Sequence, residues 1–202
     1  MDFTLDVFKD RLEKYFEKNK SFAKYVDYKT LEKDQKFLNY GERQAEFAML
    51  FDGKLISKYE YEFDNKYDSE EFVSKIFYAN VAQEKNIPFV INHESYFFNR
   101  ASTEVIEAIE RSTIVVVQKS ILDKVIESDS DLKEIFSEFE ERSFMELTNR
   151  LRDLQSLSTK HKIEKFQREN PELLSIKIDH IIKYLGIRSK DTYYRILRKL
   201  RE

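Results

Sequence analysis

Residues 178–201 read IDHIIKYLGIRSKDTYYRILRKLR, and this stretch decides the fold of the C-terminal part of the chain. Its first half predicts a short helix over 178–185 that ends at Gly186. Its second half predicts a helix that opens at Ser189, because a hydroxyl at the N-cap satisfies free backbone amides. Two short helices joined across a glycine-containing turn, the second basic and amphipathic, form the helix-turn-helix pattern.

The second helix of this pattern has two distinct faces. Tyr193, Ile196 and Leu200 form an apolar stripe that we expect to be buried. The opposite face carries charged and polar side chains that are free to enter a DNA major groove: Lys190, Asp191, Tyr194, Arg195 and Arg198. Residues 177–202 hold eight basic and three acidic side chains, a net charge of +5 that leaves −8 for the rest of the chain. A basic C-terminal segment in an otherwise acidic chain indicates a surface that attracts phosphate.

Helical periodicity extends upstream of this stretch. Apolar spacing predicts a short helix over 121–126, a long one with Asp129 or Ser130 as its N-cap, and a third after Ser158 that is stopped by Asn170-Pro171. Four apolar residues of the long helix are spaced by three, four and three positions, the pattern of a seam between two helices: Phe144, Leu147, Leu151 and Leu154. From the pattern alone, the alternative is that this stripe packs on the rest of the same chain.

Residues 25–117 have the pattern of short strands. Residues 58–63 read KYEYEF, so Tyr59, Tyr61 and Phe63 share one face, and an aromatic face of a strand is normally core. Residues 113–117 read TIVVV, a β-branched run typical of strands. Many short strands without long intervening helices predict a sandwich, jelly roll or barrel. The first twenty residues predict a helix, and the Asp64-Asn65 pair predicts a hairpin turn.

Composition excludes several classes of protein. The 202 residues are 41% apolar and 36% charged, which predicts a soluble folded chain with the cytoplasm as its default location. The absence of cysteine excludes disulfides, thiolate metal sites and cysteine nucleophiles. No apolar run approaches the length of a membrane span, and the charged start is not a secretory signal. No Ser/His/Asp set, carboxylate pair or glycine-rich nucleotide loop stands out, so we expect no enzyme activity and no cofactor.

The chain resembles the Crp/Fnr family of bacterial transcription regulators over nearly its whole length. Residues 154–158 (LQSLS), 170–174 (NPELL), 181–187 (IIKYLGI) and 189–192 (SKDT) carry the strongest match, and its helix-turn-helix part is fairly specific. The chain has only three glycines, and all lie at turns of the family pattern: Gly41, Gly53 and Gly186. Because glycine tolerates a positive φ, a glycine-poor chain is expected to keep it where a turn demands it.

The resemblance implies an α+β fold: a cyclic-nucleotide-binding-like β-roll (jelly roll) over 1–128, a long dimerisation helix over 129–157, and a helix-turn-helix domain over 158–202. It further implies a cytoplasmic homodimer that binds double-stranded DNA. By the same resemblance, Lys190, Asp191 and Arg195 are expected to read base edges, and Thr192 and Arg198 to contact phosphate. Other residues complete the expected DNA-binding set: Arg188, Ser189, Tyr194 and Lys199.

The sequence departs from the family pattern at three places. The turn Gly186-Ile187-Arg188-Ser189 is one residue longer than usual. This leaves the alignment of the recognition helix with the family pattern open by one residue. The sequence stops directly after the recognition helix, so we expect the β wing common in the family to be missing. Where nucleotide-binding members have Arg-Ser, this chain has Ser102-Thr103, with Arg100 two residues early. An anion without a positioned guanidinium is poorly held, so we expect no tight binding of cyclic AMP.

An unknown small-molecule effector stays open. Tyr96, Phe97 and Phe98 lie on a predicted loop, where they either close over an effector or pack on the long helix. The candidate effector pocket comprises six residues: Glu94, Tyr96, Phe97, Arg100, Ser102 and Thr103. The His93-Glu94 pair is far more often a solvated or capping pair than a metal site, and we expect no metal.

The resulting hypothesis is a dimeric, sequence-specific DNA-binding regulator that reads a palindromic operator and is not controlled by cyclic AMP. An RNA polymerase contact stays open, and no membrane partner is expected. The alternative is a sensor or partner-binding protein whose helix-turn-helix no longer functions. The alignment of Lys190, Arg195 and Arg198 on one face argues against that alternative.

Overall fold

The computed structural model describes residues 24–62, 69–79 and 89–201. The chain divides into two compact units. Unit 1 comprises Met1–Tyr59 and Lys75–Phe139, and unit 2 comprises Glu60–Ser74 and Glu140–Glu202. The predicted N-terminal helix and the predicted turn at Asp64-Asn65 lie outside the described residues.

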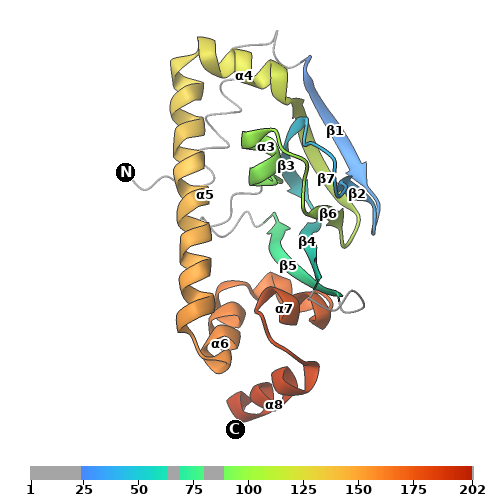
Figure 1. The fold of residues 1–202 in the computed structure, drawn as a ribbon, viewed down its shortest axis with the longest axis vertical. Helices are drawn as coiled ribbons and strands as arrows, with labels where there is room; N and C mark the ends of the chain where they lie inside the picture. Colours follow the sequence, from blue (N-terminus) through green and yellow to red (C-terminus); the bar gives the residue numbers. More distant parts are fainter. Residues whose placement is uncertain (1–23, 63–68, 80–88, 202) are drawn as a thin grey trace. The chain divides into compact units, whose positions relative to one another are not determined.

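Two sheets lie mainly in unit 1 (Figure 1), and the end of β4 and the start of β5 belong to unit 2. The pairs β1–β7, β3–β7, β2–β6 and β4–β6 are antiparallel. The first has the strand order β1-β7-β3, and the second has the order β2-β6-β4-β5. The strands are β1 (Val26–Leu31), β2 (Lys36–Leu38), β3 (Glu46–Asp52), β4 (Lys54–Glu62), β5 (Ser69–Tyr78), β6 (Val105–Ala108) and β7 (Ser112–Gln118). The β-branched run predicted as a strand is β7, the central strand of the first sheet.

Side chains from both sheets form one apolar core. Leu50 of β3 and Ile114 of β7 belong to the same buried cluster as Leu55 of β4 and Ile106 of β6. Each of these four side chains is at most 2% exposed. The two sheets therefore pack face to face, which is the arrangement of a β sandwich or jelly roll.

A second apolar cluster of unit 1 is built largely from aromatic rings. Phe47 of β3 contacts Phe136 and Phe139, with ring centroids 5.2 and 6.3 Å apart. Leu122 of α4 (Lys119–Ser128) and Ile135 of α5 (Ser130–Ser156) belong to the same cluster. The first part of α5 therefore packs in unit 1, because its apolar residues recur at helical spacing on one face.

The start of α5 is capped by Asp129, one of the two N-cap residues that the sequence left open. The Asp129 carboxylate oxygen Oδ1 accepts hydrogen bonds from the backbone amides of Asp131 and Leu132, each at 3.0 Å. A carboxylate at this position satisfies two free amides and faces the positive end of the helix.

Two sequence expectations about aromatic residues are wrong. Tyr96, Phe97 and Phe98 lie on helix α3 (His93–Phe98) and not on a loop, because the Asn92 side chain accepts from the Ser95 amide and caps the helix. The other expectation placed the aromatic face of β4 in the core.

Tyr59 and Tyr61 are instead 36% and 55% exposed, and Phe63 lies outside the described residues. Both tyrosines lie beyond the part of β4 that pairs with β6. Residues Leu55 to Lys58 of β4 pair with β6, and the strand continues beyond this pairing. Aromatic alternation therefore does not establish burial where a strand runs past its neighbour.

Unit 2 contains helix α6 (Thr159–Glu169), the 3₁₀ helix η1 (Pro171–Ser175), α7 (Ile178–Tyr184) and α8 (Lys190–Arg201). Helix α6 contacts η1 and α8, and α7 contacts α8. The buried side chains of this group include Ile163, Leu173, Ile181 and Tyr193, each at most 2% exposed. The predicted order of helices in this part of the chain is confirmed.

The glycines lie where the backbone needs them. Gly41, Gly53 and Gly186 have φ values of 80°, 94° and 64°, a region that other residues rarely adopt. At Gly53 a Cβ atom would also stand only 2.7 Å from the Cα of Ser112.

Candidate nucleic-acid interface

The turn between α7 and α8 is fixed by backbone hydrogen bonds at the end of α7. The Ile187 amide donates to the Ile182 carbonyl at 2.8 Å, and the Gly186 amide donates to the Lys183 carbonyl at 3.3 Å. With Gly186 in the left-handed region, these bonds form a Schellman motif. Ile182 and Ile187 are both buried, as expected for the apolar residues that accompany the motif. The direction in which the chain leaves α7 is therefore well defined.

Ser189 caps helix α8. Its Oγ accepts a hydrogen bond from the Thr192 amide at 3.2 Å and donates to Thr192 Oγ1 at 3.1 Å. The predicted N-cap is therefore confirmed, and α8 begins at Lys190. Asp191 lies in the first turn, where a carboxylate is favoured by the positive end of the helix.

Helix α8 presents a charged face to solvent. Tyr193 is 2% exposed and belongs to the buried side, and its burial raises the pKa of its hydroxyl. Ile196 and Leu200 are half-buried. The exposed side chains comprise seven of the nine expected DNA-binding residues: Arg188, Lys190, Asp191, Tyr194, Arg195, Arg198 and Lys199. The other two, Ser189 and Thr192, are half-buried by the cap that they form.

Lys190 has an acidic partner that the sequence analysis missed. Its Nζ lies 2.8 Å from Oδ1 of Asp179, which stands in the first turn of α7. The hydrogen bond from Lys190 lowers the pKa of Asp179. Both side chains are about half exposed, so the pair is open to exchange with an external anion. The only sequence signal was an aspartate on the preceding helix, eleven positions away, which no local spacing rule connects to Lys190.

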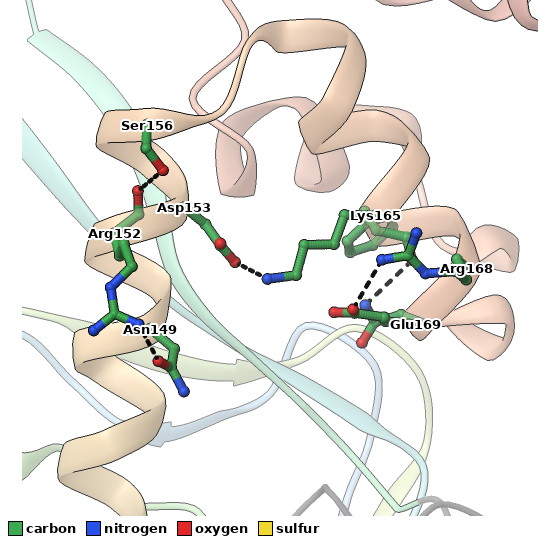
Figure 2. A network of polar contacts seen from close by, with 9 residues as sticks. Asn149, Arg152, Asp153, Ser156, Lys165, Arg168 and Glu169 are labelled. Carbon is green, nitrogen blue, oxygen red and sulfur yellow. Dashed lines mark hydrogen bonds and ion pairs between the residues drawn. The ribbon is translucent and has the colours of Figure 1, made fainter.

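Helix α6 is tied to the last turns of α5. Figure 2 shows Lys165 of α6 directed toward Asp153 of α5, and their side chains form an ion pair. Ser158 caps α6 by accepting a hydrogen bond from the His161 amide at 3.3 Å. Arg168, on the same helix, contacts Glu169 and is 71% exposed (Figure 2).

Helix α5 carries an exposed apolar stripe in unit 2. Phe144 is 72% exposed, Leu147 43% and Leu151 56%. Met145, which the sequence analysis did not single out, is 61% exposed beside them. Leu154 is half-buried and faces the α7–α8 turn, since its Cδ2 lies 3.8 Å from the Cβ position of Gly186. Three of the four predicted seam residues thus present apolar surface to solvent in the single chain.

The six candidate effector residues are only partly brought together in unit 1. Arg100 contacts Glu94 at 3.4 Å, and both side chains are exposed. Tyr96 is 4% exposed and belongs to the aromatic cluster, against which Phe97 also packs. Thr103 is exposed.

Ser102 and its neighbours form a buried polar network. Ser102 is 1% exposed, and its Oγ donates to the Glu104 carbonyl at 2.7 Å. The Glu104 carboxylate accepts from Ser57 Oγ at 2.5 Å and from Asn92 Nδ2 at 3.1 Å. These hydroxyl and amide donors are therefore already directed at a negative charge supplied by the chain.

Metal and membrane sites are not indicated by the described part of the chain. Within residues 24–62, 69–79 and 89–201, no group of three or more His, Asp or Glu residues is arranged to hold a metal ion. None of the helices in these ranges has the length and apolar character needed to span a bilayer.

Solved structures with a similar fold include bacterial regulators, whereas no protein-family model and no curated protein sequence matches the chain. FixK2 from Bradyrhizobium japonicum is 14% identical and superposes with a TM-score of 0.67, covering 87% of this chain and 84% of its own. The global regulator CLP from Xanthomonas campestris, which responds to c-di-GMP, is 14% identical with a TM-score of 0.64. The match covers 90% of this chain and 89% of the CLP chain.

A third structure names the family directly. It is a putative transcriptional regulator of the Crp/Fnr family from Eubacterium rectale, 12% identical with a TM-score of 0.67, and the match covers 92% of this chain and 82% of that one. At these identities the likeness concerns the fold, and it confirms the predicted fold class. The chain has the α+β fold of the Crp/Fnr regulators, with a cyclic-nucleotide-binding-like β-roll and a helix-turn-helix.

Proposed function

We propose that this protein is a dimeric, sequence-specific DNA-binding transcription regulator. The observation that carries the proposal is helix α8, which is capped by Ser189 and presents Arg195, Arg198 and Lys199 on one solvent-exposed face. A helix with its apolar side buried and its cations exposed fits the major groove of B-DNA.

Each exposed side chain has a chemical task in this proposal. Arg195 pairs with guanine O6 and N7, and Asp191 accepts a hydrogen bond from cytosine N4. Lys190 also reaches base edges once it leaves Asp179, a carboxylate that DNA would replace with its own acceptors. Thr192 and Arg198 contact phosphates, and Arg188 and Lys199 add attraction that does not depend on sequence.

The apolar stripe of α5 is the proposed dimer seam. Phe144, Leu147 and Leu151 lie on one helix at the spacing of facing helices, and their exposure in the single chain supports a second copy as the partner. A two-fold dimer places two recognition helices on one side of the duplex. The operator is then a palindrome with half-sites ~10 bp apart.

Cyclic AMP is not the proposed effector. The Glu104 carboxylate already holds the donors Ser57 and Asn92, and a cyclic phosphate at this place would meet a negative charge. The cation Arg100 contacts the exposed Glu94. Calorimetry with cyclic AMP should therefore show no binding constant in the micromolar range or tighter.

Selection from a random duplex library tests the central proposal. We expect a palindromic consensus, and anisotropy titrations at two salt concentrations should show weaker binding at the higher one. Arg195→Ala should cost ~1–3 kcal/mol and relax specificity at one base pair in each half-site. Arg168→Ala is the matched control, because it removes an exposed guanidinium from α6. Selection that returns no consensus contradicts the proposal, and equal effects of the two substitutions contradict the role of Arg195.

A further inference from the structure

The carboxyl end of α7 needs one more hydrogen-bond donor than its own turn supplies. The Schellman motif uses the carbonyls of Ile182 and Lys183, but the carbonyl of Tyr184, the last residue of α7, stands outside it. Arg150 of α5 supplies the donor, since its Nη2 lies 2.9 Å from the Tyr184 oxygen. A cation at this end of a helix is also favoured by the helix dipole.

The Arg150 guanidinium makes two additional contacts. Its Cζ lies 3.7 Å from the centroid of the Tyr184 ring, a cation–π geometry. Its Nη2 also donates to the carbonyl of Val73 in β5 at 3.2 Å. One side chain of α5 therefore holds a β5 carbonyl and the last carbonyl of α7 at the same time.

A second polar contact joins the same two segments. Lys183 Nζ lies 2.8 Å from Glu71 Oε1, with both side chains about one-third exposed. Glu71 and Val73 are two residues apart in β5, and Lys183 and Tyr184 are adjacent in α7. The end of α7 is thus attached to β5 at two successive positions, and Arg150 is the half-buried centre of the attachment.

We propose that Arg150 is a positioning residue for DNA recognition. By fixing the end of α7 to α5 and β5, it sets the direction of the α7–α8 turn and hence the angle at which α8 is presented. The inference rests on the proposed DNA-binding function. Arg150 itself does not contact DNA in this account, and its effect appears in the geometry of the half-sites.

The first test measures hydrogen exchange without DNA in wild type and in Arg150→Ala. Peptides covering residues 69–79 and 178–188 should both exchange faster in the variant, by about tenfold, because one side chain bonds to both segments. Arg152→Ala is the matched control, since it removes an exposed arginine of the same helix whose guanidinium contacts Asn149 (Figure 2). Faster exchange in only one of the two segments, or equally in the control, overturns the attachment.

The second test measures affinity for operators in which the spacer between half-sites is lengthened or shortened by single base pairs. Wild type should prefer one spacer, and Arg150→Ala should reduce that preference by about tenfold, since a loosely held α8 accepts several spacings. Arg150→Lys keeps the charge and should restore part of the preference. A purely structural role would lower thermal stability but leave the spacer profile of the folded protein unchanged.

The two possible failures are distinguishable. If wild type binds DNA with no preferred sequence or spacer, the proposed function fails and the role of Arg150 fails with it. If wild type prefers one spacer and Arg150→Ala retains that preference while Arg195→Ala loses base specificity, the proposed function stands and the positioning role alone is refuted.

Discussion

Leu151→Asp should separate the two copies of the proposed dimer without unfolding either one. Leu151 is 56% exposed in the single chain, so about half of its side chain remains to be buried against a partner. Full burial of a leucine contributes ~2 kcal/mol. Burial of the exposed half of Leu151 therefore contributes ~1 kcal/mol of dimerisation free energy in each copy, or ~2 kcal/mol in the pair. This loss alone raises the dimer Kd by about thirtyfold. Desolvation of two facing carboxylates increases the effect further.

Sedimentation equilibrium over a range of concentrations measures this change directly. Leu174→Asp is the matched control, because Leu174 of η1 is 45% exposed and lies outside the stripe. The control should keep the wild-type Kd, and circular dichroism should show that both variants stay folded. A wild type that remains monomeric, or a Leu151→Asp variant with an unchanged Kd, would refute the assignment of the seam.

Two further predictions concern the stability of the turns and the charge pair beside α8. Gly53→Ala should destabilise the chain by more than the ~1–2 kcal/mol expected for a positive φ, because its Cβ would stand 2.7 Å from the Cα of Ser112, a backbone atom. Gly41→Ala isolates the backbone cost, since its Cβ meets nothing within 4 Å. Equal losses in the free energy of unfolding for the two variants, measured by chemical denaturation, would contradict the steric argument. For Asp179, the hydrogen bond from Lys190 lowers the carboxyl pKa in the folded chain, so the pair contributes stability above the ordinary aspartate pKa that is lost as the pH falls through the lowered value. An NMR titration should place the Asp179 midpoint lower in wild type than in Lys190→Met, and identical midpoints would remove Lys190 as the cause.

Local features of the chain follow from the sequence where they depend on near neighbours. The Ser189 cap joins residues three positions apart, and the turn at Gly186 needs a positive φ that glycine adopts without strain. The cap at Asp129 likewise joins residues that are close in the sequence. The exposed charged face of α8 follows from helical spacing. Such contacts can be identified from residue type and spacing alone.

Long-range contacts required the tertiary structure. Arg150 bonds to carbonyls that lie 34 and 77 positions away in the sequence, and Lys183 pairs with Glu71 across 112 positions. Backbone carbonyls are the same in every residue, so no sequence pattern indicates which of them a given arginine will bind. Tyr61 likewise is exposed beyond the point where β6 begins beside β4, at the pair of Lys58 and Val105. The sequence by itself determined the helices of the C-terminal part, the caps at Asp129 and Ser189 and the charged face of α8, because these depend on local spacing. The tertiary structure decided which carbonyls Arg150 binds and which carboxylate pairs with Lys183, because these partners are distant in the sequence.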